Sequence, residues 1–173
     1  MKSKIMPTAI LGIICLVSAL ILSAINLVTA PEIARRQHEE NLKAMREVLP
    51  EATNPMLTEV YKSQIDSSIT AVYEDAAGYI FQVETTGKNP GMIVMIGVDN
   101  EGKIAGTKCT ANGETPTYAK PVFEVTENGF YKGMSSSNFK EHLVAGSTMT
   151  SKAYSGAVKA ALDAYSIIKG GQS

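Results

Sequence analysis

The chain has 173 residues, of which 45% are hydrophobic, and 16 Lys and Arg against 17 Asp and Glu give a net charge of −1. This balance excludes a general electrostatic attraction to nucleic acid, so we expect no nucleic-acid partner. The cysteines, Cys15 and Cys109, form no Cys-x-x-Cys pair, and the chain has two histidines. We therefore expect no metal centre, no iron–sulfur cluster and no internal disulfide.

The first segment is uncharged from Ile5 to Pro31. Its length exceeds the roughly 20 apolar residues that cross a bilayer, so we predict a short tail over residues 1–6 and a transmembrane helix over residues 7–30. A cleaved signal peptide is the alternative, because Lys2 and Lys4 form a basic start and Val28–Ala30 resembles a cleavage site. The apolar run outlasts the ~7–15 residues of a signal peptide's apolar h-region, which favours an uncleaved anchor.

A second helix is expected over residues 31–50, with Leu42, Met45 and Leu49 at helical spacing and Pro50 at its end. It is interpreted as a linker helix, and its apolar stripe could equally contact a partner subunit. The remaining residues, 51–173, have the usual size of one domain.

Strands are predicted in this domain by β-branched and aromatic runs, at Ile69–Tyr73, Gly78–Val83, Met92–Val98 and Ile104–Cys109. The segment Asp99–Gly102 predicts a hairpin turn between the last two. Part of a phosphate-binding loop pattern, Gly97–Lys103, covers the same turn. Ile104 stands in its Ser/Thr place and strands flank it, so no nucleotide triphosphatase is expected.

The last helix is expected to begin near Ser151 or Lys152 and to end before Gly170. Apolar residues recur on one face of it, including Tyr154, Val158 and Leu162. The helix would cover the sheet. The fold class is therefore α+β, with one N-terminal transmembrane helix followed by an antiparallel sheet packed with helices.

Small and hydroxyl-bearing residues fill Ala145–Ser151, directly ahead of this helix. Unpaired backbone N–H groups and the positive end of the helix dipole favour phosphate there, and Gly146 permits close approach. Thr148 and Thr150 add hydroxyl groups. The ordinary alternative is that these residues only cap the helix.

The stretch resembles the S/T-G-A-T-x-T/S motif of the FMN-binding domain family, which the G subunit of Rnf complexes shares with the C subunit of the sodium-pumping NADH:quinone oxidoreductase. In that family a flavin transferase links the FMN phosphate to the motif's threonine, which implies a covalent bond at Thr148. Gly146, Ser147, Met149 and Thr150 would shape the phosphate site. Three positions depart from the motif, which usually has Ser or Thr at Ala145, Ala at Ser147 and Asp at His142. Glu141, beside the last of these, could serve in place of the aspartate.

The segment Gly113–Pro116 resembles the family's E-T-P-G loop, which lies beside the flavin, with Thr117 in place of the glycine. The resemblance implies that Glu114 and Thr115 approach the cofactor. It extends to the membrane helix and to Val48–Pro50, and the overall pattern favours the G subunit within the family.

The sequence shows no catalytic set of paired carboxylates or of Ser, His and Asp, so we expect no catalytic residue. The resemblance implies a redox relay that carries covalent FMN on the outer face of the cytoplasmic membrane. Its partners would be the flavin transferase and the other subunits of an Rnf complex, an ion-translocating ferredoxin:NAD oxidoreductase that moves sodium or protons. The alternatives are a membrane-anchored binding or structural module without redox activity, and the C subunit of the sodium-pumping enzyme.

Overall fold

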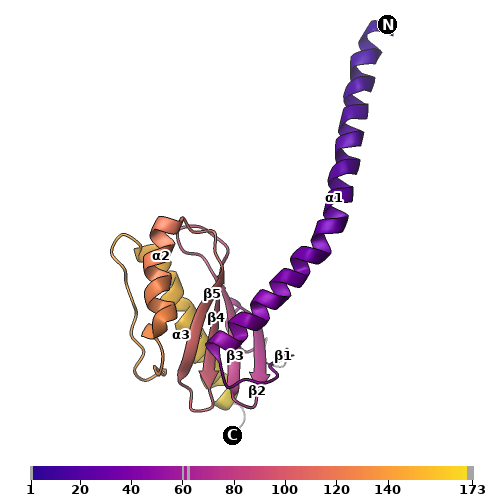
Figure 1. The fold of residues 1–173 in the computed structure, drawn as a ribbon. Coiled ribbons are helices and arrows are strands. Elements are labelled where there is room, and N and C mark those ends of the chain that lie inside the picture. Colours follow the sequence, from indigo (N-terminus) through magenta and orange to yellow (C-terminus); the bar gives the residue numbers. More distant parts are fainter. Residues whose placement is uncertain (1, 60, 62, 171–173) are drawn as a thin grey trace. The chain divides into compact units, whose positions relative to one another are not determined.

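The computed structural model describes residues 2–59, 61 and 63–170 and has the predicted α+β fold (Figure 1). Its elements in chain order are α1 (Lys2–Val48), β1 (Met56–Thr58), β2 (Ile69–Asp75), β3 (Gly78–Thr85), β4 (Met92–Asp99), β5 (Ile104–Ala111), α2 (Pro116–Val125), the π-helix η1 (Thr126–Phe130) and α3 (Thr148–Gly170).

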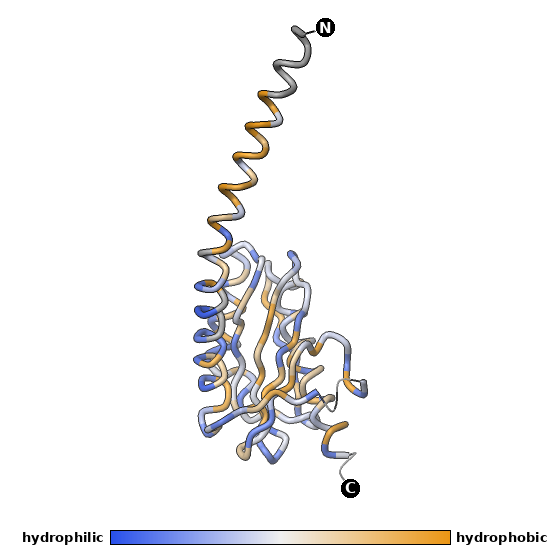
Figure 2. The backbone as a smooth tube through the Cα atoms, turned by 90° about the vertical axis from the view of Figure 1, so that its right-hand side faces the viewer, coloured by the Kyte–Doolittle hydropathy of each residue, from blue (hydrophilic) through white to orange (hydrophobic). Residues whose placement is uncertain are grey.

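The N-terminal part of α1 contains an apolar span, Ile10–Ile33, of 24 residues with a mean hydropathy of 2.6. It forms the continuous apolar stretch of the helix in Figure 2. The span is long enough to cross a membrane, as an anchor or a signal sequence would be. Of the predicted tail, Met1 lies outside the described residues and Lys2 begins α1. The predicted division of the chain at residues 6, 30 and 50 stays a prediction.

The sheet has five antiparallel strands in the order β1-β2-β3-β4-β5, so every strand pairs with its neighbour in the chain. The turn predicted over Asp99–Gly102 is confirmed, because β4 ends and β5 begins on either side of it. A β-bulge follows it, since Val98 pairs with Ile104 while Gly97 pairs with Gly106. The bulge resets which β5 residues face which side of the sheet.

Two apolar cores lie on opposite faces of the sheet. One face of β4 contributes Val94, Ile96 and Val98 to the larger core, which α2 and α3 cover. The other face contributes Met95 to a smaller core around the C-terminal end of α1. Alternation of side chains along a strand explains this division, and it leaves β4 buried on both faces.

Helices α2 and α3 lie on the same side of the sheet (Figure 1). The stripe predicted for the last helix is confirmed, since Tyr154, Val158 and Leu162 are at most 2% exposed. Helix α2, which contains Pro121 and buries Ala119 and Val122, was not predicted from the sequence. Packing of Val122 and Phe123 against the larger core outweighs the unfavourable proline.

Candidate functional site

The start of α3 differs from the prediction, because the helix begins at Thr148 and not at Ser151 or Lys152. Gly146 has φ of 79°, a conformation that favours glycine, and turns the chain into the helix. The N–H of Ser151 donates to the carbonyl of Ser147 at 2.9 Å, the first backbone bond of the helix. Ser147 is thus the capping residue, and Thr148 lies in the first turn, where backbone N–H groups lack helical partners.

The two threonines of the motif lie in opposite environments. Thr148 is exposed, as is its neighbour Met149, whereas Thr150 is 1% exposed and faces the domain interior. Helical geometry separates positions i and i+2 by roughly 200°, so the two side chains lie on nearly opposite sides of the helix. The accessible hydroxyl of the motif is therefore that of Thr148.

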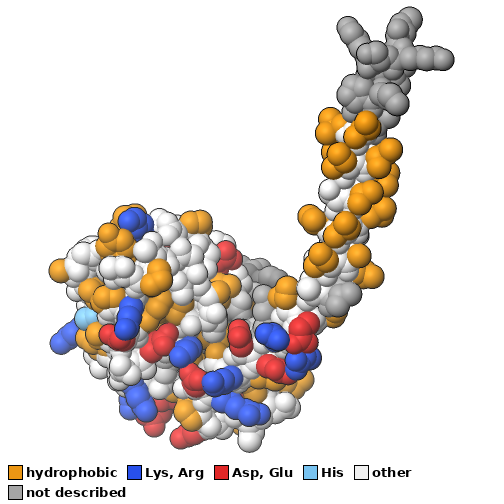
Figure 3. Space-filling view, turned by 45° about the horizontal axis from the view of Figure 1, so that its top comes forward, with side chains coloured by type: hydrophobic (Ala, Val, Ile, Leu, Met, Phe, Trp, Pro, Cys, Tyr) orange, Lys and Arg blue, Asp and Glu red, His pale blue; other side chains and the backbone are white. Residues whose placement is uncertain are grey.

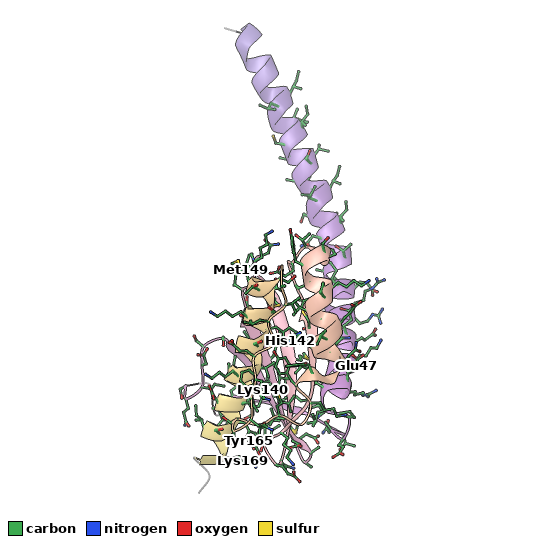
Figure 4. The ribbon with its side chains drawn as sticks, turned by 90° about the vertical axis from the view of Figure 1, so that its left-hand side faces the viewer. Glu47, Lys140, His142, Met149, Tyr165 and Lys169 are labelled. Atoms are coloured by element: carbon green, nitrogen blue, oxygen red, sulfur yellow. The ribbon has the colours of Figure 1, made fainter. Side chains whose placement is uncertain are left out.

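An open pocket of about 300 Å³ lies over the start of α3. It is lined by five of the predicted site residues, namely Gly146, Ser147, Thr148, Met149 and Thr150, and by Lys88 and Tyr118. Figure 4 shows the site's end of α3 at Met149, opposite the end with Tyr165 and Lys169. The volume is at the lower end of the range for pockets that bind small molecules and cofactors.

Lys88 and Tyr118 form a wall of the pocket that was not predicted from the sequence. The ammonium nitrogen of Lys88 lies 4.4 Å from the centre of the Tyr118 ring, within the range of a cation–π interaction. Lys88 belongs to the loop after β3, and Tyr118 to the first turn of α2. No local pattern singles out these residues, because the fold alone brings them to the N-terminus of α3.

Glu114 lies behind the pocket with a 6% exposed side chain. One carboxylate oxygen accepts a 3.0 Å hydrogen bond from the hydroxyl of Thr150, and the other accepts a 2.9 Å bond from the N–H of Asn89. Thr115 is exposed and precedes α2 as its capping residue, without a side-chain capping bond. The structure thus brings Glu114 to the motif and leaves Thr115 outside the residues that line the pocket.

The segment before the motif is tied to α3 by two buried serines. The hydroxyl of Ser151 accepts the N–H of Val144 at 3.1 Å, and the hydroxyl of Ser155 accepts the N–H of His142 at 3.2 Å. Ser155 also shares a 2.7 Å hydrogen bond with the hydroxyl of Tyr131. These bonds fix the chain that leads to Gly146.

His142 and Glu141 occupy the region where the resembled motif has its aspartate. The ring of His142 packs on Phe130 with centroids 4.4 Å apart, and Glu141 is exposed. Neither side chain is among the described residues that line the pocket. Figure 4 places His142 along the domain at some distance from the Met149 end of α3.

The charge pattern of the described surface is mixed. On the face seen in Figure 3, basic and acidic side chains are interspersed on the domain. Over the described residues, His, Cys, Asp and Glu form no cluster of three or more that could hold a metal ion. Cys109 is half-buried beside Glu127, and burial raises the pKa of its thiol to about 12. A thiol in this state is a poor nucleophile at neutral pH.

Comparison with known proteins identifies two similarities. Residues 87–163 match the model of the FMN-binding domain family. The chain is also 28% identical over 137 residues to the G subunit of an ion-translocating oxidoreductase complex from Stutzerimonas stutzeri, a match that covers 70% of this chain. It spans 57% of the length of that relative. The matched family region includes both the loop of Lys88 and the motif at the start of α3.

Proposed function

We propose that this chain, which has an FMN-binding domain and is a distant homologue of the G subunit of an oxidoreductase complex, is a membrane-anchored electron-transfer subunit. We propose further that it carries FMN covalently bound at Thr148. The observation that carries the proposal is the exposed hydroxyl of Thr148 in a pocket at the N-terminus of a helix. That position combines a reactive oxygen with backbone N–H groups and a dipole that favour a phosphate.

The residues around the pocket fit a flavin phosphate. Lys88 supplies a positive charge, and the ring of Tyr118 supplies an aromatic surface beside it. Gly146, which has no side chain, lets a ligand approach the backbone at the helix start. When bound, FMN supplies one- and two-electron redox chemistry, and the chain's own residues hold and orient it.

Attachment at Thr148 requires a separate flavin transferase and an activated FMN ester such as a flavin dinucleotide. The threonine oxygen replaces the nucleotide leaving group on the FMN phosphorus, and the hydroxyl proton is lost. Thr150 is a poorer acceptor, because its hydroxyl is buried and donates to Glu114. A hydroxyl held in this way would have to break a charge-assisted bond before it could react.

The proposal extends to the membrane and to partners by homology. The apolar span Ile10–Ile33 would anchor the chain, with the domain on the outer face of the cytoplasmic membrane. The partners would be the other subunits of an Rnf-type complex, which moves electrons between ferredoxin and NAD and couples them to sodium or proton transport. In this assembly the chain would act as a relay, with substrates bound by other subunits.

Denaturing electrophoresis of the full chain, produced together with a flavin transferase, tests the cofactor and its position. We expect flavin fluorescence on the wild-type band, loss of it in Thr148→Val, and retention in the matched control Thr150→Val. A colourless wild-type band, or fluorescence that persists in Thr148→Val, contradicts the proposal.

Protease digestion of intact spheroplasts tests the anchor and its orientation. We expect the domain to be digested while a membrane-bound fragment that contains the apolar span stays in the pellet. Protection of the domain in sealed cells, with digestion after lysis, would place it in the cytoplasm. Release of the undigested chain by alkaline carbonate would contradict membrane anchoring.

A further inference from the structure

Glu114 joins three segments that are distant in the sequence. Its carboxylate bonds the hydroxyl of Thr150 on α3 at 3.0 Å and the N–H of Asn89 in the loop after β3 at 2.9 Å. Its own N–H donates to the side chain of Asn112, at 3.2 Å, and two residues later α2 begins. Both carboxylate oxygens are therefore used inside the domain.

The packing around this carboxylate leaves it little freedom. A Cβ atom added to Gly87 would lie 2.5 Å from one Glu114 oxygen and 3.1 Å from the Cα of Thr150. The side chain of Asn89 adds a 2.8 Å bond to the carbonyl of Gly113. A buried carboxylate is retained only when its hydrogen bonds are satisfied, so the loop and the helix start must keep their places around it.

The residues that line the pocket lie close in the chain to the residues that make these bonds. Lys88 lies between Gly87 and Asn89, and Tyr118 donates its N–H to the carbonyl of Thr115, the residue after Glu114. Thr148 is in the same helical turn as Thr150. The carboxylate thus connects the positive charge, the aromatic ring and the exposed hydroxyl of the site.

We propose that Glu114 is a positioning residue, which holds the Lys88 loop and the first turn of α3 together and keeps the Thr150 hydroxyl unavailable, so that Thr148 alone is modified. This inference rests on the proposed function for its second half. The first half, the restraint on the loop, holds in the unmodified protein. Burial of Thr150 and its bond to Glu114 together are the physical basis of the selection between two hydroxyls two residues apart.

The test uses the full chain in detergent with Glu114→Ala, Glu114→Gln and the matched control Glu124→Gln on the exposed side of α2. Hydrogen exchange of the backbone N–H of Asn89, which donates to Glu114, is measured in protein made without a transferase. The flavin attachment site is then determined by peptide mass spectrometry after production with a transferase. The first measurement needs no flavin.

We expect Glu114→Ala to speed exchange at Asn89 by about tenfold or more, because its acceptor is lost. Flavin on Thr148 should fall and flavin on Thr150 should appear. In Glu114→Gln the amide oxygen can still accept from Asn89 and the amide N–H can donate to Thr150, so exchange should stay within about threefold of wild type. The control should match the wild type in both measurements.

Unchanged exchange at Asn89 in Glu114→Ala would overturn the positioning role. Exclusive and complete modification of Thr148 in the same variant would overturn the selection between hydroxyls. If Glu114→Ala does not fold, Glu114→Asp replaces it in both measurements, because the shorter side chain cannot reach the Thr150 hydroxyl and the Asn89 N–H together. Wild-type protein without flavin contradicts the proposed function, whereas exchange at Asn89 still decides the role of Glu114.

Discussion

Gly97 in β4 lies against Val48, the last residue of α1, with no space for a side chain between them. A Cβ atom on Gly97 would overlap the carbonyl oxygen of Val48, and one on its strand partner Gly106 would lie 3.0 Å from the Cα of Val48. Two glycines side by side on neighbouring strands thus let a helix end rest on the sheet backbone.

This contact predicts that Gly97→Ala destabilises the domain by roughly 2 kcal/mol or more, because neither backbone can yield without disturbing a strand or a helix end. Gly156→Ala is the matched control. Gly156 lies on the exposed side of α3 with open space around it, so alanine there should raise the free energy of unfolding by about 0.5–1 kcal/mol. Urea unfolding in detergent measures both, and equal stability of the two variants would refute the contact.

Two stacked tyrosines predict opposite responses to the loss of a hydroxyl. The rings of Tyr131 and Tyr154 lie 6.2 Å apart, and Tyr131 shares a hydrogen bond with Ser155. The hydroxyl of Tyr154 is buried near the side chains of Thr107 and Thr126 and forms no hydrogen bond of good geometry within the described part of the chain. Tyr131→Phe should cost about 1 kcal/mol, whereas Tyr154→Phe should leave the free energy of unfolding unchanged or raise it by about 1 kcal/mol. A larger loss in Tyr154→Phe would show that its hydroxyl is bonded.

Cys109 predicts a loss of stability in alkaline solution. Burial raises the pKa of its thiol from 9.0 to about 12, so the unfolded chain loses this proton at a lower pH than the folded one. The contribution of the protonated Cys109 thiol to the free energy of unfolding is fully present below pH 9. It is lost as pH rises toward 12, at up to about 1.4 kcal/mol per pH unit. Unfolding free energies of wild type and Cys109→Ala at several pH values give the difference in slope. Parallel slopes would contradict the burial of the thiol.

Lys88 predicts an electrostatic contribution to flavin attachment. Lys88→Gln removes the positive charge at the pocket, and we expect the rate of covalent loading to fall by about two- to fivefold, since the side chain is exposed and solvent screens it. Lys120→Gln is the control, because Lys120 lies on α2 outside the residues that line this pocket. The loading rates of Lys88→Gln and wild type should differ at low salt and become equal at high salt. Equal rates at low salt would remove Lys88 from the site.

Much of the sheet could be predicted because its strands have strong local signals. The runs that begin at Gly78, Met92 and Ile104 are rich in β-branched and aromatic residues, and each begins a strand as expected. β1 was not predicted, since Met56–Thr58 is short and its first two residues are exposed at the sheet edge. Such a strand forms through its partner and not through its own sequence.

The site could be predicted only where it is contiguous in the sequence. The motif from Gly146 to Thr150 was found, yet the start of α3 was placed too late because threonine and serine are weak helix formers. The bond between Glu114 and Thr150 joins residues 36 positions apart, and no periodicity connects them. The same holds for Lys88 and Tyr118, which the fold alone brings together at the start of α3.

A strand that is covered on both sides becomes an interior wall. The end of α1 covers one side of β4 and α3 covers the other, so neither face in the middle of the sheet is exposed to solvent. A flavin held at Thr148 would then lie at the end of the domain that Met149 marks in Figure 4, and donor and acceptor would both approach that end. A donor and an acceptor that bind the same end of the domain would compete for it, so the carrier would bind one of them at a time.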